Sequence, residues 1–108
     1  MPVGVADVSD QYDDAIAALR EIHEDYTLNA AQRGAAGAAI KDLYIQLGSQ
    51  AIQRVEGRTA LLSALIAELT AVSDSIQLNP VGEVLDKLNA FIEQGRTLYE
   101  ESKKELTP

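Results

Sequence analysis

The sequence predicts an all-α protein in which three to four long helices form an antiparallel helical bundle or a coiled-coil-like hairpin. Apolar residues recur at helical spacing along most of the 108-residue chain, and no segment shows the strict alternation typical of a strand. Ala, Leu and Ile dominate the apolar residues, while the chain has one Phe and no Trp. Such side chains suit close helix packing. Since no linker-like segment divides the chain, we expect a single helical domain over residues 1–108.

The first helix is expected over residues 9–26. Ser9 or Asp10 can cap its first turn, where acidic side chains also complement the helix dipole. At about 100° per residue, apolar side chains fall on one stripe and carboxylates on the opposite side. The stripe consists of Val8, Tyr12, Ala15, Ile16, Leu19, Ile22 and Tyr26, and the acidic face consists of Asp10, Asp13, Asp14, Glu21, Glu24 and Asp25. This pattern predicts a strongly amphipathic helix.

A second helical segment is expected over residues 30–77. Asn29 followed by Gln32 has the spacing of a capping box that opens a helix. Residues 30–39 are nearly all Ala and Gly, although each helical Gly costs about 1 kcal/mol relative to Ala. We interpret this small-residue segment as a surface that another helix approaches closely. A flexible hinge is the alternative.

Apolar residues then keep helical spacing without a slip in phase. The members of this stripe are Ile40, Tyr44, Leu47, Ala51, Val55, Leu62, Leu65, Leu69, Val72 and Ile76. Because no proline or polar loop interrupts the segment, we favour one continuous helix over residues 30–77, and a break near 48–49, at Gly48-Ser49, is the close alternative. The stripe of a continuous helix would exceed what the two shorter helices can cover, so we expect a homodimer or a higher assembly.

The last helix is expected over residues 80–105. Asn79 can cap it and Pro80 suits its first position, so Leu78-Asn79-Pro80 indicates a chain reversal. Its apolar side contains Val81, Val84, Leu85, Leu88, Phe91, Ile92, Gly95, Leu98 and Tyr99. Residues 50–77 and 80–105 have similar lengths, and we expect them to form an antiparallel hairpin.

The chain is acidic, with a formal net charge of −8. The first 26 residues hold most of this charge, since Arg20 is their one basic residue against Asp7, Asp10, Asp13, Asp14, Glu21, Glu24 and Asp25. Phosphate backbones and anionic membranes repel such a chain, so we expect neither nucleic acid nor a membrane as partner. The N-terminus lacks the features of a secretory signal, and no uncharged apolar run has the length of a membrane span. We therefore expect a cytoplasmic protein, with non-classical export as the alternative.

The residues offer little for catalysis or metal binding. His23 is the one histidine, and Thr27 and Arg20 stand where zinc or di-iron helical motifs would place a second ligand. We interpret His23 as a half-buried helix residue. No serine has the surroundings of a nucleophile elbow, and no glycine pattern fits a phosphate loop. We expect no catalytic residue, metal or cofactor, and hence a protein that is not an enzyme.

Arg54 and Arg58 are spaced one helical turn apart, and Arg58 interrupts the apolar stripe. One interpretation is an interhelical or intersubunit salt bridge, for example to the acidic first helix. The other is an arginine whose stem packs on apolar neighbours while its guanidinium reaches water.

The leading functional hypothesis is a non-enzymatic helical protein-protein interaction module: an adaptor, assembly factor, chaperone-like protein or structural subunit. The alternative is an acidic inhibitor or immunity-type protein that neutralises a basic partner, and a remote alternative is an enzyme with an intersubunit site. The candidate partner-binding residues are those of the acidic face, Asp10, Asp13, Asp14, Glu21, Glu24 and Asp25. A solvated helix face is the competing interpretation of these carboxylates.

Overall fold

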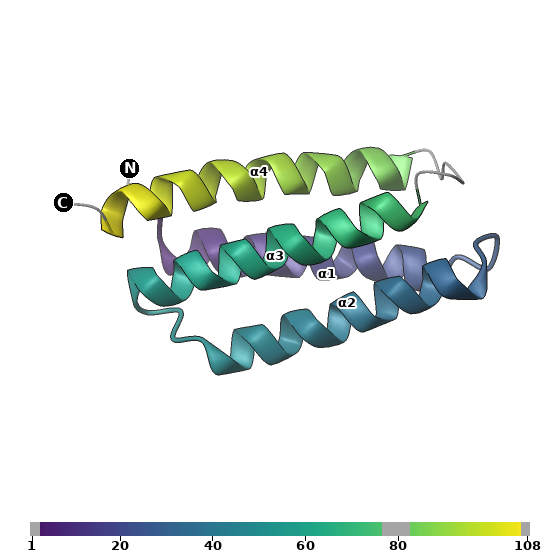
Figure 1. The fold of residues 1–108 in the computed structure, drawn as a ribbon, viewed down its shortest axis with the longest axis horizontal. Coiled ribbons are helices and arrows are strands. Elements are labelled where there is room, and N and C mark those ends of the chain that lie inside the picture. The colour runs from purple at the N-terminus through teal and green to yellow at the C-terminus, as the bar shows by residue number, and fades with distance from the viewer. Residues whose placement is uncertain (1–2, 77–82, 107–108) are drawn as a thin grey trace.

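Four antiparallel helices make up the protein in a computed structural model that describes residues 3–76 and 83–106 (Figure 1). Helix α1 spans Val5–His23, α2 spans Ala30–Ser49, α3 spans Val55–Ile76 and α4 spans Glu83–Leu106. No strand occurs in these ranges. The prediction of an all-α helical bundle is confirmed.

Helices α1 and α3 occupy the middle of the bundle. Each contacts all three other helices, whereas α2 and α4 make no contact with each other within the described residues. In Figure 1, α4 and α2 accordingly lie at opposite edges, with α1 and α3 between them. The bundle is long and narrow, measuring 47 × 23 × 18 Å along its principal axes.

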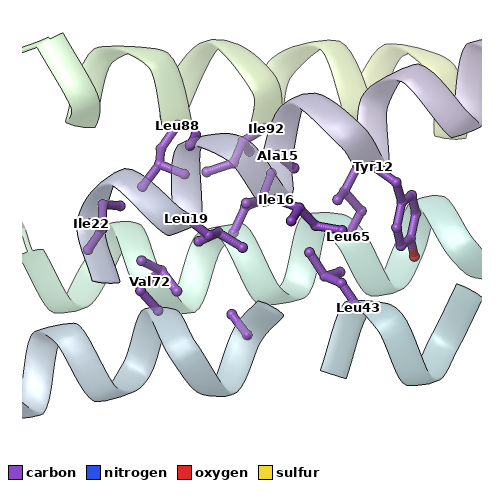
Figure 2. Packing of buried hydrophobic residues seen from close by; sticks show 14 of the residues in the cluster. Tyr12, Ala15, Ile16, Leu19, Ile22, Leu43, Leu65, Val72, Leu88 and Ile92 are labelled. Carbon is purple, nitrogen blue, oxygen red and sulfur yellow. The ribbon is translucent and has the colours of Figure 1, made fainter. Parts of the chain in front are cut away.

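The hydrophobic core lies where the four helices meet. Figure 2 shows α1 side chains packed between residues of the other three helices, such as Leu43, Leu65 and Leu88. The apolar stripe predicted for the first helix is buried at Val8, Tyr12, Ala15, Ile16, Leu19 and Ile22. Its last predicted member, Tyr26, is 80% exposed. That part of the prediction is wrong, because α1 ends at His23 and Tyr26 lies in the following turn.

Helix α1 begins at Val5 rather than at residue 9. Its cap is Gly4, whose backbone N–H donates to the Asp7 carboxylate at 2.8 Å. Ser9 and Asp10 are therefore inside the helix and cap nothing. The extra turn buries Val8 against the core while Val3 packs just ahead of it, which explains why the helix starts one turn early.

The predicted capping box of the second helix is confirmed. The Asn29 side chain accepts from the Gln32 N–H at 2.8 Å, and the Gln32 side chain accepts from the Asn29 N–H at 3.3 Å. Ala36 and Ala39 are buried, and a Cβ on Gly37 would lie 3.0 Å from the His23 ring. The small residues thus allow α1 to approach, and α2 runs through them as one helix.

The continuous helix over residues 30–77 is wrong, because α2 ends at Ser49 and α3 begins at Val55. The break falls directly after Gly48-Ser49, the alternative position. Residues 50–54 fold back against the first turn of α3, where a Cβ on Gly57 would lie 1.9 Å from the Ala51 carbonyl oxygen. A glycine at this position is therefore what permits the reversal.

Arg58 holds the same reversal together. Its Nη1 atom donates to the carbonyl oxygens of Ile52 and Gln53, both at 3.0 Å. The residue is buried, while Arg54 is exposed. The Arg58 guanidinium thus binds backbone carbonyls of its own loop, which neither interpretation of this arginine anticipated.

The last helix is described from Glu83 to Leu106, so Asn79, Pro80 and Val81 lie outside the described residues. Leu88, Ile92 and Gly95 of the predicted apolar side are buried, and its other described members are partly buried. Between α3 and α4 the hydroxyls of Thr59 and Ser102 hydrogen-bond each other. The hairpin predicted for the second half of the chain is present as α3 and α4.

The break between α2 and α3 also removes the reason for expecting a homodimer. The chain folds back and covers Leu62, Leu65, Leu69, Val72 and Ile76 with its own helices. Two members of the long stripe stay exposed, Ala51 and Tyr44. Tyr44 is 49% exposed, and its hydroxyl accepts from Arg20 at 2.8 Å. Any self-association must therefore use a different surface.

Candidate interaction surfaces

The structure divides the predicted acidic face into two parts. Asp10, Asp13, Asp14 and Glu21 are exposed along α1, whereas Glu24 and Asp25 lie beyond its last residue. Asp25 accepts from the hydroxyl and the backbone N–H of Thr27, at 2.6 and 3.0 Å. These two bonds, the hydroxyl bond first, hold the pKa of the Asp25 carboxyl below its usual range. Asp25 is therefore engaged in shaping the turn.

An acidic groove runs between α1 and α4. Asp7, Asp10 and Glu101 line it, its volume is about 390 Å³, and no Lys or Arg is among the lining residues. Gln11 donates to Gln94 across the groove at 3.0 Å, which ties the two helices together. The sequence pointed to Asp10 but missed the contribution of Glu101, because only the antiparallel packing of α4 on α1 brings it there.

Further along the same pair of helices, the acidic face is partly neutralised. Asp14 and Glu21 line a smaller hollow of about 220 Å³ together with Lys87 and Phe91. The Lys87 ammonium lies 3.7 Å from the Glu21 carboxylate, with both side chains about half exposed. Such an exposed pair contributes little stability, but it removes one carboxylate from the surface that a basic partner would meet.

The outward side of α2 holds two of the four exposed large apolar side chains among the described residues. Tyr44 is 49% and Ile45 is 54% exposed. Six residues opposite the buried side of α2 recur at the three-and-four spacing of a helical seam and are all exposed: Ala31, Gly34, Ala38, Lys41, Ile45 and Gly48. We call these six residues the outer face of α2. A Cβ on Gly34 or Gly48 would meet no heavy atom within 4 Å, so neither glycine is required by packing inside the chain.

Comparison with α4, the other edge helix, shows how unusual this surface is. The exposed residues of α4 are mostly charged, with acidic and basic side chains interspersed, whereas α2 exposes two charged residues, Lys41 and Asp42. The sequence pattern indicated a surface that another helix approaches closely, without separating the side that faces α1 from the side that faces solvent. The missed signal was that Ala and Gly occupy both sides of the helix, not one.

His23 connects α1 to the start of α2. The distance between its Nδ1 and the Arg33 carbonyl oxygen is 3.0 Å, which makes Nδ1–H the donor, and Arg33 Nε donates back to the His23 carbonyl at 3.1 Å. The Arg33 guanidinium also lies 4.0 Å above the centre of the Tyr26 ring. His23 is exposed rather than half-buried. Within the described residues, no group of three or more His, Cys, Asp or Glu side chains is placed to hold a metal ion.

Two polar clusters lie among the buried and half-buried residues. The Tyr12 hydroxyl donates to the Leu61 carbonyl at 2.6 Å, and burial, with a smaller effect from the Glu68 charge, raises the pKa of Tyr12 well above its usual value. Burial, followed by the Asp42 charge, raises the pKa of Glu68. In a groove of about 460 Å³ between α3 and α4, the Ser73 hydroxyl donates to Asn89 at 2.9 Å.

Comparison with known proteins adds no functional information, since no protein family, curated protein or solved structure was found to match the chain. Helix α3 is long and apolar enough, by length and composition alone, to cross a membrane. That helix lies in the middle of the bundle and contacts the other three, and a core helix of a soluble protein satisfies the same criteria. Because no known protein matches the chain, function is inferred from the exposed surfaces of α1 and α2.

Proposed function

We propose that the protein is a non-enzymatic helical protein-protein interaction module of the cytoplasm, and that it binds through the exposed side of α2, which consists of the outer face and the neighbouring Tyr44. The observation that carries this proposal is the exposure of Tyr44 and Ile45 on a helix whose outward side otherwise offers mainly Ala and Gly. Exposed apolar surface rimmed by polar residues is typical of binding sites. Small side chains allow a partner helix to come close to the α2 backbone.

The position of α2 favours the same conclusion. Helix α2 lies at one edge of the bundle and, among the described helices, packs on α1 and α3 (Figure 1). Arg20 holds the Tyr44 side chain through its hydroxyl, so part of the surface is ordered before a partner arrives. Preorganised aromatic side chains lose little conformational entropy on binding.

Site-specific photo-crosslinking tests this proposal. A benzophenone side chain replaces Tyr44 in one version of the chain and Ala71 in the control version, and both are irradiated in living cells. Ala71 is exposed on α3. Discrete adducts at position 44, absent at position 71, are expected, and mass spectrometry identifies them. Equal labelling at both positions, or none at position 44, would exclude α2 as the binding surface.

A second candidate function is the acidic inhibitor, and the groove between α1 and α4 favours it. Asp7, Asp10 and Glu101 converge there without a basic lining residue, which suits the ammonium or guanidinium group of a basic segment.

An oligolysine of about 20 residues is the probe for this second candidate function. Its affinity for the protein should fall steeply between 50 and 300 mM salt, because salt screens the attraction between opposite charges. The double variant Asp10→Asn, Glu101→Gln should lose most of this salt dependence. Unchanged binding in this variant would eliminate the groove.

A further inference from the structure

Two carboxyl groups face each other across the contact between α2 and α3. Asp42 is exposed on α2, Glu68 is partly buried on α3, and the two side chains hydrogen-bond each other. Among the described residues, neither carboxyl forms an ion pair with a lysine, arginine or histidine. An ionised carboxylate only accepts hydrogen bonds. The bond between Asp42 and Glu68 therefore requires a proton on one of them.

The neighbouring helices do not compensate the charge of this pair. Helix α1 brings Tyr12 close, because burial and, after it, the Glu68 charge raise the pKa of Tyr12. Helix α4 packs on the other side of α3, where Gly95 approaches Ile66, and Ile66 is about 200° around the helix from Glu68. The titratable groups that face Glu68 are thus Asp42 and Tyr12, and both become negative when they ionise. A second negative charge at this place is unfavourable.

The same surroundings change how Glu68 titrates. Burial, the Asp42 charge and the hydrogen bond to Asp42, in that order, raise the pKa of Glu68. Two carboxyls held this close titrate as a pair. The pair keeps one proton to a higher pH than a lone carboxyl does, because both members cannot ionise without repulsion.

We propose that Asp42 and Glu68 share one proton in mildly acidic solution, and that this proton tightens the docking of α2 on α3. Two other polar contacts lie on the same side of α3, from the Gln32 amide to the Ser75 carbonyl and from the Arg58 guanidinium to the loop that follows α2. Neither contact involves a carboxyl, so both persist as the carboxyls titrate. The carboxyl pair is the part of the contact between α2 and α3 that responds to pH, whatever α2 binds.

The direction of the pH effect follows from the two states of Glu68. In the unfolded chain its pKa returns to the ordinary value of 4.5, whereas the folded protein holds the proton to a higher pH. The stabilisation is therefore fully present below pH 4.5 and is lost as the pH rises through the raised pKa of Glu68. Docking of α2 on α3 is expected to be weaker in neutral than in mildly acidic solution.

Carbon-13 NMR of the side-chain carboxyl groups, recorded from about pH 3 to 8, tests whether the pair shares a proton. Asp42→Asn should lower the titration midpoint of Glu68, because the amide removes the neighbouring charge and can donate to the Glu68 carboxylate. The control Asp86→Asn removes the same charge at an exposed site on α4, which does not contact α2 within the described residues, and should leave the midpoint unchanged. A Glu68 midpoint that does not move in Asp42→Asn, or that moves equally in the control, overturns the proposal.

Urea unfolding between about pH 4.5 and 7.5 measures the effect of the proton on docking. In Glu68→Gln the amide donates to Asp42 at every pH, so this variant should lack that part of the decline in stability. The unfolding constant of the parent should rise about two- to fivefold more than that of Glu68→Gln, the usual size for partly exposed charged pairs. The control Glu56→Gln, at an exposed site on the same helix, should follow the parent.

Asp42→Asn repeats this comparison from the other side of the bond. Asp42 is exposed, so the substitution leaves the core intact, and its unfolding constant should also depend less on pH than that of the parent. Parallel profiles for the parent and both amide variants, or an equal flattening in Glu56→Gln, would show that the proton does not act between α2 and α3.

Discussion

At the scale of single residues, two buried polar side chains bind backbone carbonyls that lie far from them in the sequence. The Tyr12 hydroxyl donates to Leu61, and the Gln32 amide donates to Ser75 at 3.1 Å. Each bond connects the middle helix α3 to a different neighbour. A buried donor without a partner would cost about 1–3 kcal/mol, so these bonds select one register between the helices that they join.

Replacing Tyr12 by Phe tests the first of these bonds. The ring stays in the core, where Tyr12 is fully buried, but the Leu61 carbonyl loses its donor. We expect Tyr12→Phe to lower the free energy of unfolding by about 1–2 kcal/mol at pH 7 in urea titrations. The control is Tyr99→Phe, since Tyr99 contacts Lys103 through the face of its ring, with the ammonium 5.2 Å from the centroid. Similar losses in both variants would contradict a special role for the Tyr12 hydroxyl.

The raised pKa of Tyr12 also predicts how stability changes in alkali. Burial keeps this hydroxyl protonated in the folded protein, whereas in the unfolded chain it ionises at about pH 10. The unfolded state thus loses a proton first, and stability falls as the pH rises above about 10. Tyr12→Phe should lack this part of the decline. Unfolding curves between pH 8 and 11 provide the measurement, and parallel profiles for parent and variant would contradict the shift.

The sequence predicted some of these residues and not their partners. The Asn29 and Gln32 capping box follows from local spacing, because both bonds lie within one turn. The bond from Gln32 to Ser75 spans 43 positions and depends on how α2 packs on α3. The same limit applies to Glu101 in the acidic groove, since helical periodicity indicates which residues share a face but not which helix that face meets.

At the scale of elements, the first turn of α3 determines where the second helix ends. Gly57 lies against the Ala51 carbonyl, and Arg58 binds the carbonyls of residues 52 and 53. Helical periodicity alone predicts no break in this region, because Ala51 and Val55 keep the phase of the apolar stripe. The sequence does contain a signal for the break, because Gly57 is followed by Arg58, a polar member of an otherwise apolar stripe. Such a pair suits a loop that folds back on the start of a helix.

We expect Gly57→Ala to destabilise the protein by about 3 kcal/mol or more, because a Cβ cannot lie 1.9 Å from a carbonyl oxygen and the loop must move. The matched substitution Gly34→Ala, at a site facing open space, should stabilise the protein by up to about 1 kcal/mol. Thermal and chemical unfolding at low protein concentration measure both. Two changes of the same sign would show that the loop does not press on Gly57.

At the scale of the whole molecule, one core joins all four helices, so core substitutions on two different helices should cost similar amounts of stability. Leu69 on α3 and Leu88 on α4 are both fully buried. Replacing either by Ala should cost about 2–5 kcal/mol, through lost burial and the cavity that remains. Leu106→Ala, at a leucine that is 41% exposed, should cost far less. A near-neutral result for Leu69 or Leu88, measured in urea, would remove that residue from the core.

The uneven distribution of charge is the other property of the whole molecule. Helix α1 exposes Asp10, Asp13, Asp14 and Glu21 with Arg20 as its one exposed arginine, while the acids of α4 lie among Lys87, Arg96, Lys103 and Lys104. Repulsion among like charges opposes the folded state and is screened by salt. This repulsion should therefore be strongest on α1. The free energy of unfolding should depend more on the charges of α1 than on those of α4.

Neutralising one pair of carboxylates on each helix separates these contributions. We expect Asp13→Asn with Asp14→Asn to raise stability by up to about 1 kcal/mol in 20 mM salt, since both residues lie among like charges. Glu93→Gln with Glu100→Gln removes the same charge beside Arg96 and Lys103, which lie 2.7 Å from Glu93 and 4.0 Å from Glu100, and should give no gain. In 0.5 M salt, where screening is nearly complete, the advantage of the α1 variant should disappear. Melting temperatures at both salt concentrations measure the effect, and an equal gain from the two pairs would mean that the net charge of the chain, rather than its concentration on α1, limits stability.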